Sequence, residues 1–121
     1  DEGGGHGAHG AHGAAGRPRA VAPDVGRIAF PISATPAARR EFERGVGYLH
    51  SFLYPEAAQH FRRARALDSN AVLAASFEAL AWTHPVWNIQ DTARARAALR
   101  TIAPTREARL ARARTARERA W

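Results

Sequence analysis

Three histidines near the start of the chain are the residues whose type and spacing suggest chemistry most directly. His6, His9 and His12 stand three residues apart in a run of glycine and alanine. Imidazole nitrogens on a flexible tether can close around Zn²⁺, Cu²⁺ or Ni²⁺. With three ligands and no fixed geometry, such a site would bind weakly and select poorly among these ions. The alternative is a flexible spacer that remains after a signal peptide is cleaved and that holds no cofactor.

Two further histidines, His50 and His84, are separated by 34 residues. If the chain is built of 34-residue helical repeats, the two imidazoles occupy equivalent places on neighbouring helices, roughly 10 Å apart. They could then contact the same ligand. The alternative is that each imidazole forms a hydrogen bond with a helix terminus, and both interpretations stay open at this point.

An apolar stripe precedes His50 in the sequence. Phe42, Val46 and Leu49 recur at the i, i+4 and i+7 spacing of one helical face. This face either packs against the apolar residues 25–32 as part of the core or forms a groove for a partner peptide. On the second interpretation, these three residues join His50 and His84 as candidate partner-binding residues.

Motifs typical of enzymes are missing from the sequence. There is no glycine-rich phosphate loop and no His-Glu-x-x-His pair, and the absence of cysteine excludes thiol catalysis, disulfides and cysteine-ligated metals. A pair of carboxylates for acid–base chemistry would have to come from Glu41, Glu43, Glu56 or Glu78, which we expect at exposed helix positions. We therefore expect a protein that is not an enzyme.

Positive charge is concentrated near the end of the chain. All 18 basic residues are arginines, against 11 acidic residues. The segment from Arg94 to Trp121 holds nine arginines and two glutamates, so it carries the whole net charge of +7. This segment could bind nucleic acid, anionic lipid or an acidic partner. The absence of lysine favours the alternative, a solvated helix face in an arginine-rich proteome, so nucleic acid is the less favoured partner.

The elements that position these residues follow from composition and periodicity. A chain of 121 residues is long enough for one small domain, and no run of apolar residues is long enough to span a membrane. Residues 1–22 should be a disordered Gly/Ala/His-rich tail and linker, residues 23–34 an extended strap, and residues 35–121 a helical domain. The predicted fold class is therefore all-α.

Capping residues and prolines divide the helical domain. Thr35 and Pro36 begin the first helix, and Pro55 follows the start of the second. The sequence Asp68-Ser69-Asn70 should end the second helix and cap a third over residues 71–82. A fourth helix should open at Asn88 or Asp91, and a fifth at Thr105. The final predicted helix opens with a Thr115–Glu118 capping box close to the end of the sequence, from which we expect the natural chain to continue.

A repeat of two helical units fits this division. Residues with the spacing expected of a tetratricopeptide repeat are Gly45, Tyr48, Tyr54, Ala57, Phe61 and Ala64. A shift of 34 residues pairs side chains of similar size, namely Gly45 with Ala79, Val46 with Leu80, Tyr48 with Trp82, and His50 with His84. The glycine and alanines let paired helices approach closely. We expect about two antiparallel helix hairpins of this type.

The chain also resembles a group of bacterial tetratricopeptide-repeat proteins that are usually exported. The segments that carry the resemblance are Asp24–Pro31, Phe42–Gly45, Leu49–Phe52, Tyr54–Ala57, His84–Trp87, Pro104–Thr105 and Thr115–Ala120. The group usually has a Tyr-Trp-Gly-like step where this chain has Ala75-Ser76-Phe77. The resemblance implies a scaffold that binds a protein or peptide, located in the periplasm or secreted. A cytoplasmic location and a metal-binding role for the histidine tail are the alternatives.

Overall fold

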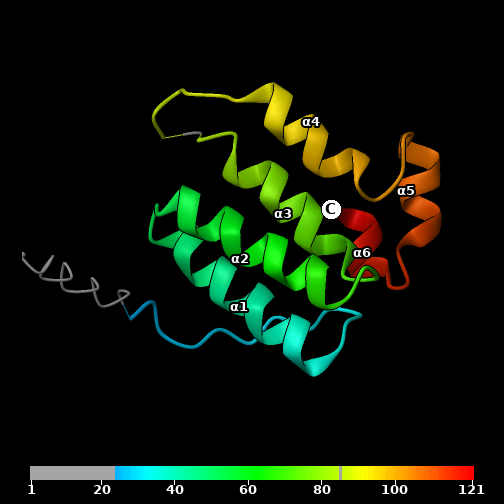
Figure 1. Ribbon diagram of the computed structural model, residues 1–121, viewed down its shortest axis with the longest axis horizontal. Coiled ribbons are helices and arrows are strands. Elements are labelled where there is room, and N and C mark those ends of the chain that lie inside the picture. Colours follow the sequence, from blue (N-terminus) through cyan, green and yellow to red (C-terminus); the bar gives the residue numbers. More distant parts are fainter. Residues whose placement is uncertain (1–23, 85) are drawn as a thin grey trace, which may run out of the picture.

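The computed structural model describes residues 24–84 and 86–121, which form helices joined by loops (Figure 1). The helices in these two ranges are α1 (Pro36–His50), α2 (Tyr54–Leu67), α3 (Val72–Ala81), α4 (Thr92–Arg100), α5 (Arg106–Arg112) and α6 (Ala116–Ala120). Neither range contains a β-strand, so the predicted all-α class is confirmed for the described part of the chain. The predicted tail, with His6, His9 and His12, lies outside the described residues.

The first four helices pack side by side in the order of the chain. Helix α1 packs on α2, α2 on α3, and α3 on α4, while α1 and α3 touch only slightly. Figure 1 shows this arrangement, with α5 and α6 gathered near the end of the stack where α4 ends and α3 begins. Since each helix contacts mainly its neighbours in sequence, the packing is close to one-dimensional.

A single glycine sets the distance between α1 and α2. A Cβ atom added to Gly45 would lie 2.6 Å from the ring of Phe61, which is too close for any pair of carbon atoms. The Phe61 ring is fully buried against the bare backbone of α1. The predicted role of Gly45 in the close approach of these two helices is therefore confirmed.

The core is an aromatic cluster that the strap completes. The rings of Phe42, Phe61 and Phe77, one from each of α1, α2 and α3, have centroids 5.0–5.7 Å apart. Phe30 of the strap adds its ring at 5.4 Å from Phe42 and 5.5 Å from Phe77. Edge-to-face contacts at these distances add to the stabilisation that comes from burial alone. Residues 24–34 therefore lie across the α1 and α3 face of the stack.

This packing corrects part of the predicted partner groove. Phe42 is fully buried and Val46 is 2% exposed, so neither side chain can contact a partner. Leu49 is half-buried and packs against the same core. The groove interpretation is wrong for Phe42 and Val46 because the strap, through Ile28, Phe30 and Ile32, fills the space that a peptide would occupy.

Carboxylates hold the strap in place at three points. The N–H of Phe30 donates to Glu43 at 3.0 Å, and the N–H of Ser33 donates to Glu118 of α6 at 2.8 Å. Asp68, just after α2, accepts from the N–H of Thr35 at 2.8 Å. These bonds satisfy main-chain donors that an extended segment cannot pair within itself.

Most of the predicted helix starts are correct. The side chains of Thr35, Asp91, Thr105 and Thr115 each accept a hydrogen bond from the first turn of the helix that follows. The Thr115–Glu118 capping box is present with both of its bonds. The predicted cap of α3 is wrong, because Ala71 precedes that helix without a side-chain bond. Asp68 is instead engaged by the N–H groups of Thr35 and Asn70.

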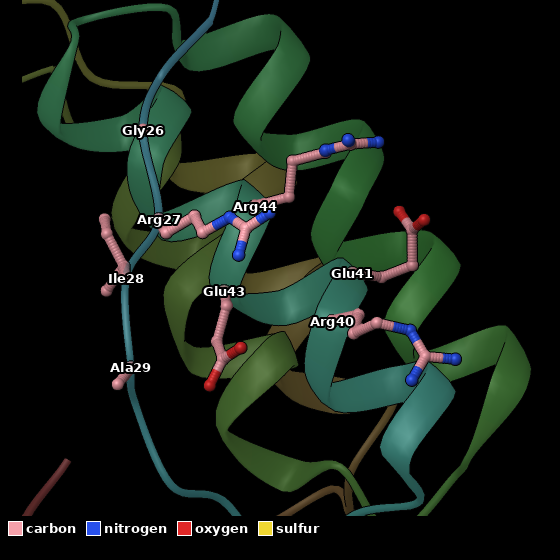
Figure 2. Close-up of a pocket in the computed structure, with 8 residues that line it drawn as sticks. All are labelled: Gly26, Arg27, Ile28, Ala29, Arg40, Glu41, Glu43 and Arg44. Atoms are coloured by element: carbon pink, nitrogen blue, oxygen red, sulfur yellow. The ribbon is translucent and has the colours of Figure 1, made fainter.

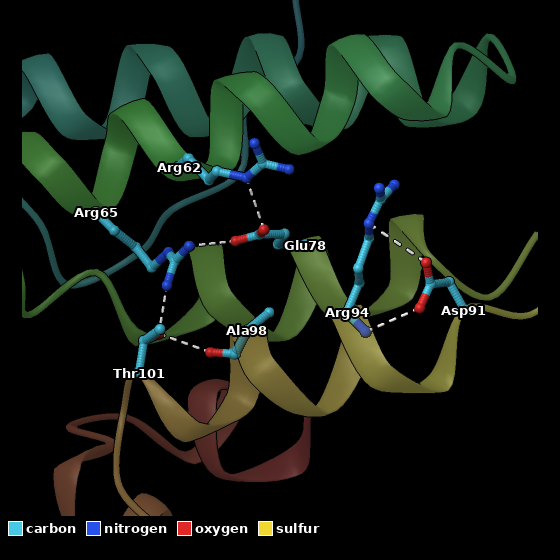
Figure 3. Close-up of polar contacts among 7 residues, drawn as sticks. All are labelled: Arg62, Arg65, Glu78, Asp91, Arg94, Ala98 and Thr101. Carbon is cyan, nitrogen blue, oxygen red and sulfur yellow. Dashed lines mark hydrogen bonds and ion pairs between the residues drawn. The ribbon is translucent and has the colours of Figure 1, made fainter.

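A buried carboxylate joins α2 to α3. Glu78 was expected at an exposed position, but it is 5% exposed and lies between the guanidinium groups of Arg62 and Arg65 (Figure 3). Arg65 also donates to Thr101 at the end of α4. The expectation was wrong because α3 is covered on both sides, by α2 and by α4, so that even its polar positions face other helices.

Candidate functional site

Two loops meet at the end of the stack opposite α5 and α6. The first comprises residues 51–53 between α1 and α2, and the second comprises the described residues 82–84 and 86–91 between α3 and α4 (Figure 1). The rings of Tyr54 and His84 stack across this junction, with centroids 4.2 Å apart and planes 19° apart. We call these two loops together the loop end. His50, the last residue of α1, borders the first loop, and His84 belongs to the second.

Phe52 occupies a backbone position that usually requires glycine. Its N–H donates to the carbonyl of Leu49 at 3.1 Å, and the N–H of Leu53 donates to Tyr48 at 2.9 Å. This pair of bonds is the Schellman pattern, in which the residue after the helix cap takes the left-handed conformation. Phe52 does so with φ 59°. A bulky residue with this φ is strained by roughly 1–2 kcal/mol.

The strained conformation places the Phe52 ring in solvent. The side chain is 55% exposed, and its ring makes only an edge contact with Tyr54, at a centroid distance of 6.4 Å. The conformation therefore costs stability and gains little packing in return. A strained residue with an exposed aromatic side chain is a reason to consider a functional role.

The second loop exposes three more large apolar side chains. Val86, Trp87 and Ile89 are 58–59% exposed, and Asn88 between them has φ 50°. Asparagine tolerates this conformation better than most residues. The loop is nevertheless pinned at its base, where the N–H of Asp91 donates to the carbonyl of Trp82 at 2.8 Å.

The two loops expose most of the large apolar side chains of the described residues, and we call these exposed side chains of the loop end the patch. Four of the seven large apolar side chains that the described residues expose belong to them, namely Phe52, Val86, Trp87 and Ile89. Single exposed apolar residues need no explanation, but such a cluster on adjacent loops is typical of an interaction surface. Loops held on a rigid scaffold are also where binding residues are most often found.

The two predicted histidines border the loop end and have different surroundings. His50 is exposed at the last position of α1, whereas His84 is half-buried against Tyr54. The Nε2 atom of His84 is buried and has no hydrogen-bond partner in the described part of the chain. This Nε2 atom therefore does not form the hydrogen bond to a helix terminus that was one of the two interpretations for this histidine.

Sequence reasoning missed the residues that form the patch itself. Helices often end with a glycine in the left-handed conformation, but the residues that follow α1 include no glycine. The absence of glycine there was the available indication that Phe52 adopts a strained turn. Val86 and Trp87 were part of the family resemblance, but no periodicity places them on a surface. Their exposure depends on the ten-residue loop, whose path sequence patterns do not predict.

The arginine-rich segment makes many contacts within the chain. Three of its guanidinium groups donate to main-chain carbonyls, namely Arg109 to Ala103 and Pro104, Arg112 to Ile102, and Arg119 to Ala113. Arg94 lies over the ring of Trp82 at 4.8 Å, and Arg117 lies over Phe30 at 5.3 Å. These five arginines are engaged within the chain, so they do not form the purely solvated helix face that was the alternative to phosphate binding.

Among the described residues, the pKa values of two carboxyl groups are shifted. Burial by itself would raise the pKa of Glu118, but the N–H groups of Ser33, Arg114 and Thr115 donate to its carboxylate, so the pKa is lowered below its ordinary value. Hydrogen bonds from Asn70 and Thr35 lower the pKa of Asp68. Glu118 accepts the N–H of Ser33 and Asp68 accepts the N–H of Thr35, so both carboxylates bind the segment that leads into α1. Neither lies at the loop end.

In residues 24–84 and 86–121, no three side chains of the metal-ligating types gather closely enough to hold a metal ion. The helices in the same ranges include none that is long and apolar enough to cross a membrane. Comparison of the chain with protein-family models, with curated proteins and with solved structures found no match.

Proposed function

We propose that the chain is a non-catalytic scaffold of the tetratricopeptide-repeat type that binds another protein through its loop end. The observation that carries the proposal is the exposed ring of Phe52, which is held in a strained backbone conformation, together with the exposure of Val86, Trp87 and Ile89 in the other loop at this end of the stack. Aromatic side chains that are rigidly placed on a surface are the residues that dominate protein–protein binding energies.

Two features of the helical stack support a repeat scaffold, and two depart from it. Helices α1 to α4 pack in chain order, as repeat hairpins do. Gly45 and Ala79, which are paired by the 34-residue shift, are both buried, and so are Tyr48 and Trp82. The third pair departs from this pattern, since Val46 is buried and Leu80 is 38% exposed. Helix α3 has 10 residues against 15 in α1, so the second unit is shortened.

The place of binding differs from the one that repeats of this type suggest. The face of α1 and α3, where a peptide would be expected, is covered by the strap through Phe30. The loop end is an apolar surface that this covering leaves open. A partner would therefore contact loop residues rather than the helical face.

A capture experiment with matched variants tests the proposal. The wild-type chain, a Phe52→Gly/Trp87→Ser variant and a Leu67→Ser control are immobilised and exposed to extract of the cells that produce the protein. Leu67 is a suitable control because it is 53% exposed and lies at the far end of α2 from the loop end. Quantitative mass spectrometry compares the retained proteins.

We expect one discrete partner that the wild type and the Leu67→Ser control retain equally and that the double variant loses by at least tenfold. Circular dichroism confirms that all three chains have the same helix content. Equal retention by the three chains, or retention that disappears at moderate salt, would contradict the proposal.

A further inference from the structure

A pocket lies at the end of the stack opposite the loop end, between the α3–α4 pair and helices α5 and α6. Figure 1 shows these last two helices beside the start of α3 and the end of α4. They contact the first four helices only slightly, which leaves a space of about 220 Å³. An apolar cavity of about 150 Å³ holds a benzene molecule. The pocket therefore has room for one ring with a short side chain.

A larger groove lies between the strap and α1, but its charged side chains do not face one ligand. It measures about 720 Å³, and Arg40 and Arg44 are among the residues that line it. Figure 2 shows these two arginines extending from α1 on the side away from the strap. The smaller pocket differs, because a hydrogen bond holds a guanidinium group on its wall.

Apolar side chains from four segments of the chain line this smaller pocket. Val72 of α3 is buried, whereas Leu99 of α4, Ile102 of the following turn and Leu110 of α5 are half-buried. Trp121, just after α6, also lines the pocket and is 60% exposed. A ligand with an apolar body would remove part of this remaining apolar surface from water, which stabilises the bound state.

The guanidinium group on the wall belongs to Arg119 of α6. Its Nη1 atom donates to the carbonyl of Ala113 at 3.3 Å, and both residues line the pocket. Its other nitrogen atoms donate no hydrogen bond within the described residues. The bond holds the guanidinium group in place and leaves donors unused, so an anion can bind with little further ordering of the side chain. Arg106 and Arg109 of α5 also line the pocket and add two positive charges.

The pocket does not supply an acceptor for these arginines. Glu118 is the acidic side chain among its lining residues, and its carboxylate already accepts three main-chain N–H groups. In the described part of the chain, none of the three arginines forms an ion pair with an acidic side chain. Guanidinium groups with unused donors favour a carboxylate, which they can bind through two parallel hydrogen bonds.

We propose that this pocket binds a small carboxylic acid that carries one aromatic ring or an aliphatic group of similar size. The apolar body lies between Leu99, Ile102 and Leu110, and the carboxylate binds Arg119. A free acid fits better than the carboxyl end of a peptide, because a peptide also brings amide N–H groups that need acceptors. The carboxylate of Glu118 is already engaged by the main chain.

Titration of the ¹⁵N-labelled chain with 3-phenylpropionate, followed through the NMR shifts of its amide groups, tests the proposal. Two compounds separate the contributions of charge and ring. 3-Phenylpropanamide keeps the ring and loses the charge, whereas acetate keeps the charge and loses the ring. The tripeptide Gly-Gly-Phe presents a similar ring and carboxylate at the end of a peptide.

Three protein variants place the ligand in the pocket. Arg119→Gln removes the proposed partner of the carboxylate, and Arg112→Gln is its matched control. Arg112 also donates from Nη1 to a main-chain carbonyl, that of Ile102, but it does not line the pocket. Ser76→Leu fills the pocket from the α3 wall. Circular dichroism shows whether the variants retain their helix content.

We expect saturable binding of 3-phenylpropionate with a Kd below about 1 mM. The amide shifts should be concentrated around the pocket, with none at the loop end. Arg119→Gln and Ser76→Leu should each weaken binding at least tenfold, and Arg112→Gln less than twofold. The amide compound, acetate and Gly-Gly-Phe should each bind at least tenfold more weakly than 3-phenylpropionate.

Four results would overturn the proposal. Equal loss in the two arginine variants, or equal binding of acetate, would show a general attraction of anions to the basic chain. Equal binding of the amide compound would show that the carboxylate has no partner in the pocket. Binding of Gly-Gly-Phe as tight as that of the free acid would identify the ligand as a peptide end instead.

Discussion

At the scale of the residue, Phe52 takes the backbone conformation that glycine adopts most easily. Its φ of 59° costs roughly 1 kcal/mol relative to glycine. Because the ring is largely exposed, replacing it removes little packing. We predict that Phe52→Gly raises the free energy of unfolding in urea by about 1 kcal/mol.

Phe52→Ala is the control for that prediction, since alanine loses the ring but keeps the penalty for positive φ. It should show no gain in stability. If Phe52→Gly instead lowers the free energy of unfolding by about 1 kcal/mol or more, the ring packs within the chain and is not held there for a partner.

Residue types alone predicted some side-chain environments and missed others. The Thr115–Glu118 capping box could be predicted because both of its bonds are local to one turn of helix. The burial of Glu78 could not, since its partners Arg62 and Arg65 come from a different helix. A carboxylate in an alanine-rich helix has the same sequence pattern whether it faces water or two guanidinium groups.

At the scale of the element, the approach of α1 to α2 depends on Gly45. A methyl group at this position would lie 2.6 Å from the Phe61 ring. The free-energy cost of this clash is larger than the gain from the better helix propensity of alanine. We predict that Gly45→Ala lowers the free energy of unfolding by about 1–2 kcal/mol. Urea denaturation of Gly45→Ala, Phe61→Leu and the double variant checks this. The double variant should be more stable than the sum of the single effects, and simple additivity would contradict a clash with the ring.

The strap is tied to α6 by Glu118, and this tie should depend on pH. The folded-state pKa of Glu118 is below its ordinary value of 4.5, so its contribution is complete above that pH and is lost as the pH falls through the lower, folded-state pKa. We predict that Glu118→Gln lowers stability at pH 7 by roughly 1–2 kcal/mol, because one amide oxygen replaces a carboxylate that accepts three N–H groups.

Two measurements check the prediction for Glu118. The amide of Ser33 should exchange with solvent faster in the variant, and the fall in stability below pH 5 should become shallower. Some acid dependence will remain, because the pKa of Asp68 is also lowered. Unchanged exchange at Ser33 would mean that the strap is held without this carboxylate.

At the scale of the whole molecule, periodicity was enough to predict an all-α chain and most helix starts. It could not decide which surface remains open. The stripe of Phe42 and Val46 fits a groove or a core equally well, and only the path of the strap across Phe42 and Phe77 decides for the core. Periodicity also could not predict the loop end. Two loops that are distant in sequence form it, and they come together through the stacked rings of Tyr54 and His84.

The most direct test of the loop end as the binding surface is site-specific photo-crosslinking. A benzophenone amino acid replaces Trp87 in one variant and, as a control, Leu67 in another, and each is irradiated in cell extract. We predict a single crosslinked product of discrete mass from position 87 and none from position 67. Products of equal yield from both positions, or none from position 87, would contradict the account.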